Sequence, residues 1–170
     1  MCRLLGNIAQ TNAGGLMMGT AFKLSDCLIQ SNVAVTGSAG GVYAVGPPSS
    51  GDGIVAGSRI LHNIAGDASA GVVLGALCVA TNCEIAFNVC SNLVSLYGGA
   101  GIEMGTAAKL YNSLVHHNVA TNYYAPGTTS RRYGVGGVYS GYNPLVRNCL
   151  VYANRGVRAG GMNIQRPGVV

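Results

Sequence analysis

Aliphatic residues alternate with polar or small residues over short stretches of the chain, as at residues 27–29 and 83–85. A period of two places successive side chains on opposite faces of a strand, whereas a helix repeats every 3.6 residues. The 27 glycines also argue against helices as the recurring element. The pattern therefore predicts short β-strands joined by corners rich in Gly, Asn and Ser.

Six segments fit one template: Cys or Ser, any residue, an aliphatic residue, two free positions and Asn, followed in most copies by Ile or Val and a small residue. They are residues 2–9, 27–34, 58–65, 83–90, 113–120 and 149–156. Their shared asparagines are Asn7, Asn32, Asn63, Asn88, Asn118 and Asn154. A repeat that runs along the whole chain predicts a solenoid, in which each unit buries its apolar face on its neighbours.

A pair of small residues followed by an aliphatic residue is the second anchor of each unit, as in residues 14–16 and 40–42. From this pair to the next asparagine the gap is 17 residues in four cases, whereas the gap from 41 to 63 is 22. From asparagine to pair the gap varies from 7 to 19 residues. One side of the unit is therefore nearly constant, and the other carries inserts.

The shortest complete period is 25 residues. That length suits three short strands per turn at about 3.3 Å rise per residue, with turns stacked about 4.8 Å apart. The Leu-x-x-Leu-x-Leu run of leucine-rich repeats is absent. We predict an all-β fold, a single parallel β-helix (β-solenoid) domain of about six turns over residues 1–170. The sequence leaves open whether this is a fragment of a longer solenoid.

The strings GGVYSGYNPLVRNCLVYANRG and GAGIEMGTAAKLYNSLVHHNVATN resemble the degenerate repeats of right-handed parallel β-helix proteins of the pectin-lyase-like superfamily. The resemblance spans nearly the whole chain and implies a right-handed coil. It also implies an extracellular or cell-surface location, although no signal peptide precedes the first repeat. Because the superfamily includes lyases, hydrolases, phage tailspikes and adhesins, the resemblance implies architecture more than activity.

Two aliphatic columns are expected to point inward, and the asparagines are expected to form a corner ladder that satisfies backbone groups and tolerates a left-handed conformation. The first column is Leu4, Ile29, Ile60, Ile85, Val115 and Val151. The second column is Ile8, Val33, Ile64, Val89 and Val119.

Composition narrows the function classes. An apolar fraction of 49% is enough to fill a continuous core. The sequence contains no run of 18 apolar residues, so it predicts no membrane span. The net charge of +5 arises because there are only five acidic residues. This charge permits contact with acidic polymers. The sequence lacks the dense basic stripe that is typical of a specific nucleic-acid binder.

The cysteines and histidines predict no metal site and no cofactor. Cys2, Cys27, Cys83 and Cys149 share one column with serines, which favours buried free thiols over disulfides, and the redox compartment stays open. His62 and His117 share a corner column with Phe87 between them. Two turns, about 10 Å, are too far for shared metal ligation, so a surface ladder is expected.

The acidic residues argue against catalysis. Glycoside hydrolysis needs two carboxyl groups about 5 to 10 Å apart, and no pair is expected on one face of neighbouring turns. Glu84 is instead expected to form a cross-strand ion pair with Arg59. The GxSxG motif of serine hydrolases is also missing. The acidic residues are Asp26, Asp52, Asp67, Glu84 and Glu103.

Two large inserts, after Asn88 and after Asn118, are expected to project from one corner, where aromatic and guanidinium groups suit sugar rings and anionic polymers. The candidate ligand-binding residues are Tyr123, Tyr124, Arg131, Arg132, Tyr133, Arg155 and Arg158. The outward face around His116 and Tyr152 is the alternative location. We expect a non-catalytic structural or binding β-helix that recognises a polysaccharide or acts in surface adhesion. The alternative is a carbohydrate-active enzyme, a lyase or a glycoside hydrolase.

The N-terminal turn is the expected site of self-association. Cys2, Leu4 and Asn7 already follow the template, so the apolar cross-section around Leu4, Ile8 and Leu16 has no cover. A homodimer through this end, head to head, would close with two-fold symmetry, and head-to-tail stacking would give filaments.

Overall fold

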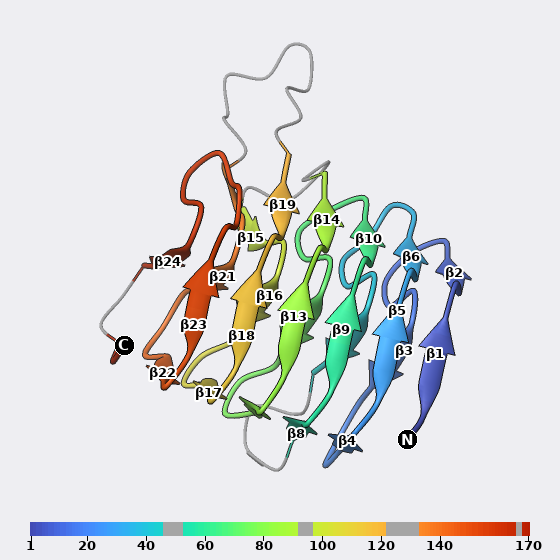
Figure 1. Cartoon of the computed structure of the whole chain (residues 1–170), viewed down its shortest axis with the longest axis horizontal. Coiled ribbons are helices and arrows are strands. Elements are labelled where there is room, and N and C mark those ends of the chain that lie inside the picture. The colour runs from blue at the N-terminus through green and yellow to red at the C-terminus, as the bar shows by residue number, and fades with distance from the viewer. Residues whose placement is uncertain (46–52, 92–96, 122–132, 166–167) are drawn as a thin grey trace.

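The computed structural model describes residues 1–45, 53–91, 97–121, 133–165 and 168–170, with Tyr97 and Tyr133 described through their backbone alone. Every element in these ranges is a β-strand, and all pairing between strands is parallel. The strands stack turn upon turn along one axis (Figure 1), with the N-terminal and C-terminal turns at opposite ends. The predicted all-β parallel β-helix is therefore confirmed.

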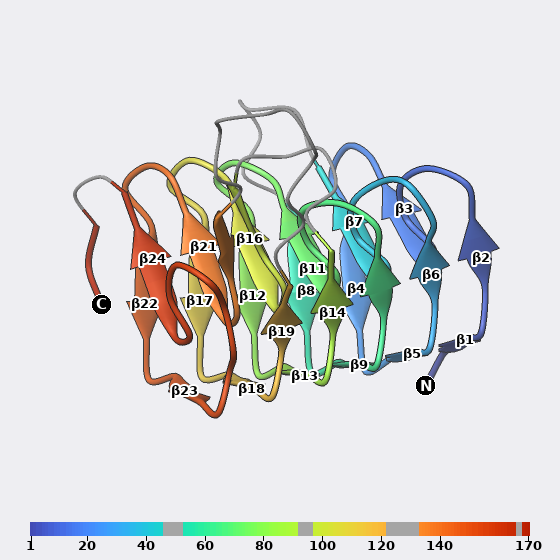
Figure 2. The ribbon, with the colours of Figure 1, turned by 90° about the horizontal axis from the view of Figure 1, so that it is seen from above.

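Two sheets flank the asparagine corner. Sheet A contains β1 (Arg3–Leu5), β5 (Leu28–Gln30), β9 (Arg59–Leu61), β13 (Glu84–Ala86), β18 (Leu114–His116) and β23 (Leu150–Tyr152). Sheet B contains β2 (Ile8–Ala9), β6 (Val33–Ala34), β10 (Ile64–Ala65), β14 (Val89–Cys90) and β19 (Val119–Ala120). Figure 2 shows sheet A edge-on, with the chain turning from each of its strands except β23 into sheet B.

Two further sheets complete each turn, and a short fifth sheet lies before sheet C. Sheet C contains β3 (Leu16–Met18), β7 (Val42–Ala44), β11 (Val72–Leu74), β16 (Ile102–Met104), β21 (Val138–Ser140) and β24 (Met162–Ile164). Sheet D contains β4 (Lys23–Ser25), β8 (Ile54–Ala56), β12 (Val79–Thr81), β17 (Lys109–Tyr111) and β22 (Leu145–Arg147). Sheet E pairs β15 (Tyr97–Gly99) with β20 (Tyr133–Val135).

A turn with all its strands has four short segments, one in each of sheets A to D, where the sequence led us to expect three. The additional segment is the two-residue strand of sheet B. It arises because the chain bends sharply at the residue before the asparagine and pairs again directly after it. The expected length of the repeat was compatible with this, because each segment is only two or three residues long.

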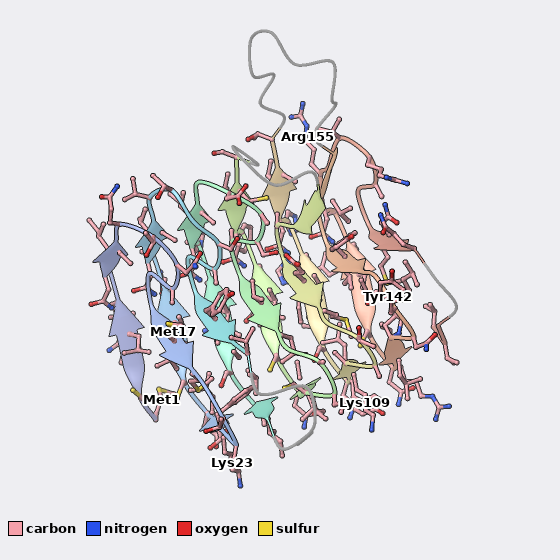
Figure 3. The ribbon with its side chains drawn as sticks, turned by 180° about the vertical axis from the view of Figure 1, so that it is seen from behind. Met1, Met17, Lys23, Lys109, Tyr142 and Arg155 are labelled. Carbon is pink, nitrogen blue, oxygen red and sulfur yellow. The ribbon has the colours of Figure 1, made fainter. Side chains whose placement is uncertain are left out.

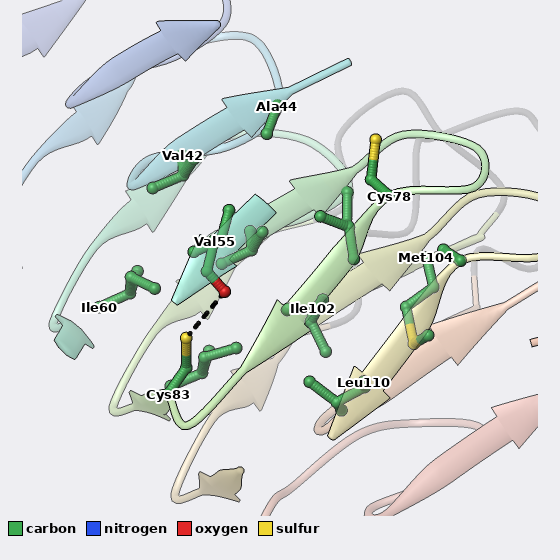
Figure 4. Close-up of a cluster of buried hydrophobic side chains, with 14 of the residues drawn as sticks. Val42, Ala44, Val55, Ile60, Cys78, Cys83, Ile102, Met104 and Leu110 are labelled. Atoms are coloured by element: carbon green, nitrogen blue, oxygen red, sulfur yellow. Dashed lines mark hydrogen bonds between the residues drawn. The ribbon is translucent and has the colours of Figure 1, made fainter. Parts of the chain in front are cut away.

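The first predicted core column is confirmed. Its members pair in register from Leu4 through Ile29, Ile60 and onward to Val151. The four inner members are fully buried, and the two outer members, Leu4 and Val151, are partly buried. They pack with Val55, Ile102, Met104 and Leu110 of sheets C and D in one apolar cluster (Figure 4).

The second predicted core column is wrong. Ile8 and Ile64 are 74% and 46% exposed, and Val33, Val89 and Val119 are only partly buried. Because the asparagine side chain already points inward, the next residue points outward and the small residue after it points inward. Ala65, Cys90 and Ala120 of sheet B accordingly form a second, small-residue cluster with Ala70 and Ala100.

The asparagine ladder is continuous. From Asn32 to Asn154, each Oδ1 accepts hydrogen bonds of 2.9 to 3.0 Å from the backbone N–H and the Nδ2 of the asparagine one turn earlier. From Asn32 onward, Nδ2 also donates to a sheet A carbonyl, at 2.8 to 3.1 Å. The ladder therefore satisfies backbone groups as expected.

We expected the asparagine itself to take the left-handed conformation at this corner. The residue before the asparagine takes it instead. Ser31, His62, Phe87 and His117 have φ between 54° and 58°. The small-residue pair of the template is explained by the ladder itself. A Cβ on Gly71 would lie 2.9 Å from Asn88 Nδ2 and 2.9 Å from Ile85 Cγ2, so only glycine fits there.

Candidate functional site

The predicted loop-corner site is only partly covered by the described residues. Tyr123, Tyr124, Arg131 and Arg132 lie outside them, and Tyr133 is described through its backbone in β20. Arg155 and Arg158 are described, and both are exposed. The structure therefore gives the positions of the two arginines, and ligand binding by all seven residues stays a prediction.

The backbone fixes Arg155 on the outer side of sheet B. Arg155 forms a parallel bridge with Val119, in which its N–H donates to Asn118 and its carbonyl accepts from Ala120, both at 2.8 Å. Arg158 lies nearby in the chain, where its N–H donates to the carbonyl of Gly134 in β20. Figure 3 shows Arg155 at the opposite edge of the solenoid from Lys23 and Lys109.

A cavity of about 420 Å³ opens beside Arg155. Its described lining residues are Val119, Ala120, Thr121, Arg155, Gly156 and Val157. The lining therefore combines apolar residues with one arginine. Small-molecule sites have this composition, an apolar wall with a few polar groups that fix orientation.

A row of rings follows the corner column, as the sequence predicted. His62 stacks on Phe87 with ring centroids 4.8 Å apart, and Phe87 stacks on His117 at 5.1 Å. His62 and His117 are exposed and Phe87 is 39% exposed. Because the rings cover one another's faces, the row presents mainly ring edges to solvent, and an incoming ligand would meet polar imidazole atoms there.

The predicted ion pair between Glu84 and Arg59 is confirmed and has a third member. Arg59 Nε donates to Glu84 Oε2 at 2.6 Å, and the two residues are register partners in sheet A. Glu84 Oε1 lies 3.4 Å from Nε2 of His116, whose ring is largely buried. The ring of His116 in turn stacks on Tyr152 with centroids 4.8 Å apart.

The expectation that no acidic pair shares one face of neighbouring turns stays a prediction, but one acidic pair interacts through its charges. The negative charge of Asp67 acts on the carboxyl of Glu103, which also accepts a 2.8 Å hydrogen bond from Ser69. Burial raises the pKa of Glu103, the Ser69 hydrogen bond opposes this shift, and Asp67 adds to it. Asp67 is buried, and Glu103 is half-buried on β16.

A signal for this acid pair was present in the sequence. Asp67 lies four residues before Gly71, and Glu103 lies two residues after Gly101, so both flank the small-residue pair on consecutive turns. Because we compared strands and not corners, we placed the two acids apart. The nearby Cys90 is fully buried, and its pKa is raised by burial and by the charges of Asp67 and Glu103.

The shared cysteine column is confirmed in its inner turns. Cys27 and Cys83 are buried free thiols, Cys149 is half-buried and Cys2 is exposed. Cys83 Sγ lies 3.5 Å from the carbonyl of Val55 (Figure 4) and 3.2 Å from that of Thr81. Burial raises the pKa of Cys83 and Cys149 above the ordinary thiol value, which disfavours the reactive thiolate.

Within the described ranges, no group of three or more His, Cys, Asp or Glu side chains is arranged to hold a metal ion. None of the described elements is a helix long and apolar enough to span a membrane. Comparisons with protein-family models, curated proteins and solved structures gave no significant match.

Proposed function

We propose that this β-helix is a non-catalytic binding protein that recognises an acidic polysaccharide at the cavity beside Arg155. The observation that carries the proposal is the cavity itself, which is lined by apolar residues and by the exposed Arg155. An apolar wall suits the carbon face of a sugar ring, and a guanidinium group binds carboxylates with a planar fork of donors.

The surroundings of the cavity support a polymer more than a single sugar. Arg155 lies next to Val119, and the outward column of sheet B continues from Val119 along the solenoid axis. A linear ligand could follow this exposed column, whose turns repeat about every 4.8 Å. The net charge of +5 favours an acidic ligand over a neutral one.

Binding of polygalacturonate and alginate, measured at two salt concentrations, tests this proposal. Arg155→Ala should weaken binding and flatten its salt dependence, because an exposed charge contact is screened by salt. Lys109→Ala is the matched control: it also removes one exposed positive charge, but at the opposite edge (Figure 3). Equal affinity of Arg155→Ala and wild type would refute this site.

The predicted residues outside the described ranges need their own variant. Arg131→Ala combined with Arg132→Ala should add to the effect of Arg155→Ala if the insert contributes to the same site. A loss in this double variant, with Arg155→Ala unaffected, would move the site to the insert. Unchanged binding in all three variants would move it to the outward face around His116 and Tyr152.

The second candidate is a carbohydrate-active enzyme, and one observation favours it: the coupled pair Asp67 and Glu103. Glycoside hydrolysis uses one carboxyl group with a raised pKa as the acid and a second carboxylate as the base or nucleophile, and Glu103 has the raised pKa that the acid requires. Release of new sugar ends from either polymer, abolished by Glu103→Gln and by Asp67→Asn, would establish this function. We expect no release above background.

The pH dependence of stability tests whether this pair is buried as described. The pKa of Glu103 is raised above its ordinary value of 4.5, so the folded protein binds the proton more tightly than the unfolded chain. Its contribution to stability is therefore full below pH 4.5 and is lost as the pH rises through the folded pKa. Glu103→Gln should remove this loss and unfold at higher urea concentration at neutral pH.

We further propose that the chain belongs to the pectin-lyase-like superfamily and acts outside the cell or at its surface. The six-fold template and the buried asparagine ladder support the superfamily assignment. Self-association through the N-terminal turn remains part of the proposal, and it is supported by the inward residues Leu4 and Leu16, which are only partly buried at that end. Ile8 lies beside them on the outer side of the edge strand β2. Light scattering after size exclusion should show wild-type dimers or larger assemblies and monomeric Ile8→Lys; a wild-type monomer at high micromolar concentration would contradict it.

A further inference from the structure

Two consecutive histidines, His116 and His117, lie on the same side of the chain. In a regular strand successive side chains point to opposite faces. Here β18 ends at His116, and His117 takes the left-handed conformation with φ of 54°. The corner therefore turns the second imidazole toward the first, and the two Nδ1 atoms lie 2.9 Å apart.

The orientation of both rings is fixed by their neighbours. His117 stacks on Phe87 and His116 stacks on Tyr152, with interplanar angles of 23° and 19°. The two imidazoles are nearly perpendicular to each other, at 88°. Such packing holds the two nitrogen atoms in place before any ligand arrives, so little side-chain entropy would be lost on binding.

The other nitrogen of His116 faces a carboxylate. Glu84 Oε1 lies 3.4 Å from Nε2 of His116, and Arg59 holds the second oxygen of Glu84. A carboxylate in this position favours a proton on Nε2 and leaves the lone pair on Nδ1. Histidines that ligate metals commonly donate their distal N–H to such a carboxylate, which fixes the tautomer and the ring orientation.

The 2.9 Å separation of the two Nδ1 atoms can be compared with the ligand separations of known metal coordination geometries. Two nitrogens bound about 2.0–2.1 Å from one metal at a right angle lie about 2.9 Å apart, whereas tetrahedral ligands lie about 3.3 Å apart. Right-angle nitrogen ligands are typical of the square-planar or tetragonal geometry of Cu²⁺ and Ni²⁺. Among divalent first-row metals, Cu²⁺ also binds such ligands most tightly.

We propose that Nδ1 of His116 and Nδ1 of His117 form an open two-histidine site for Cu²⁺, with Glu84 as the group that orients His116. Without metal the two nitrogens share a hydrogen bond. On metal binding the shared proton leaves Nδ1 of His117, and Nε2 of the same exposed ring takes up a proton from water, so that both Nδ1 atoms have a free lone pair. The metal binds both nitrogens from one side of the line that joins them, and water completes its coordination on the exposed side of His117. The site has two protein ligands, which agrees with the lack of any described cluster of three or more ligating residues.

The chain offers closely matched variants for a test. His117→Phe removes one nitrogen but keeps an aromatic ring at a corner position that already accepts Phe87 one turn earlier. His62→Phe is the control, because His62 occupies the same column, has the same φ of 54° and also stacks on Phe87. Both variants are made in a Cys2→Ser background, since Cys2 is an exposed thiol that binds copper on its own.

Calorimetric titration with Cu²⁺, combined with electron paramagnetic resonance, gives the readout. The Cys2→Ser protein and its His62→Phe variant should bind one Cu²⁺ with a tetragonal spectrum that shows two nitrogen ligands. His117→Phe should lose this one-to-one binding, and Glu84→Gln should weaken it by about 10- to 100-fold. No stoichiometric binding by the parent protein would overturn the proposal, and so would a His117→Phe variant with the parent spectrum and affinity.

Discussion

Two corners of each turn place a polar side chain inward, but they use different residue types. At the corner between sheets A and B the inward polar residue is always asparagine, whereas at the corner between sheets D and A it is cysteine or serine. Both corners bend at a left-handed residue, for example Phe87 at the first and Asn82 at the second. The chain therefore reuses one backbone bend with two different side-chain solutions.

The difference lies in how many backbone groups each side chain must satisfy. Asn88 accepts two hydrogen bonds from Asn63 and donates to Ile60 and Asn118, all in a fully buried position. Ser58 accepts one hydrogen bond, from the N–H of Cys27, and donates to the carbonyl of Ala56 in its own turn. A column with more bonds per side chain tolerates less variation, which explains why only the second column is mixed.

The largest expected effect is at the asparagine corner. Asn88→Ala leaves the N–H and Nδ2 of Asn63 and the carbonyl of Ile60 without their partner in a buried site. At about 1–3 kcal/mol for each of these three groups, the free energy of unfolding should fall by roughly 3–9 kcal/mol. Urea unfolding followed by circular dichroism measures this.

Asn7→Ala is the matched control for that variant. Asn7 is exposed, and its side chain donates only to Asn32, so the loss should stay below about 1 kcal/mol. Equal losses in the two variants would show that the ladder contributes through something other than burial of its bonds.

The next largest loss of stability is expected at Gly71, which packs against the asparagine ladder. Gly71→Ala brings a Cβ against the carbonyl of Gly101, against Asn88 Nδ2 and against Ile85. Overpacking of this kind costs about 1–3 kcal/mol or more. Gly161→Ala, in the same column with nothing within 4 Å of its Cβ, should change the unfolding free energy by less than about 0.5 kcal/mol. If the Gly161 variant loses as much, glycine is required there for a reason other than space.

A smaller effect is expected at the cysteine–serine corner. Ser58→Ala removes the acceptor of the Cys27 N–H and should cost about 1–2 kcal/mol. Cys83→Ser should cost less than about 1 kcal/mol, because serine already fills this column at Ser58 and Ser113. Thermal unfolding of both variants compares them directly. A Cys83→Ser loss as large as that of Asn88→Ala would contradict the proposed difference between the corners.

The smallest effect is expected at the bend itself. Gly57 has φ of 55° in a column where Asp26, Asn82 and Asn112 also take left-handed conformations. Gly57→Asn should therefore change stability by no more than about 0.5 kcal/mol, whereas Gly57→Val should cost more than about 1 kcal/mol, because β-branched residues are strained there. Similar chemical-denaturation midpoints for the two variants would show that this bend does not constrain the side chain.

The parts of the fold that repeat could be predicted from the sequence. Ile60, Ile85 and Val115 form the predicted buried column because a strand period of two, anchored on the asparagine, leaves only one inward choice. The same period failed for Ile64 and Val89 because the left-handed residue before the asparagine shifts the alternation by one position. The hydrophobicity of Ile64 and Val89 predicted burial, but the bend before the asparagine turns their side chains outward.

The candidate sites were less predictable, because they depend on contacts between turns that lie far apart in sequence. The Glu84–Arg59 pair was predictable from register within one sheet. The coupling of Asp67 with Glu103 crosses from a corner to a strand, and the approach of His116 to His117 depends on one φ angle. Neither relation follows from the repeat template, which fixes columns but not the angle between neighbouring side chains.

The asparagine ladder also gives the solenoid a direction. Along the row each side-chain amide oxygen accepts from the asparagine of the preceding turn, and each amide nitrogen donates to the oxygen of the asparagine in the following turn. From Asn32 onward the nitrogen also donates to a sheet A carbonyl of the preceding turn. The amide dipoles are therefore aligned in series along the axis, with an acceptor at one end of the row and donors at the other. Two Asn7 ends brought face to face would oppose acceptor to acceptor, whereas an added turn or a second copy in the same sense would extend the row. The row thus marks the polarity of the coil and distinguishes the two modes of self-association: head-to-head closure opposes two acceptors, whereas head-to-tail stacking continues the row.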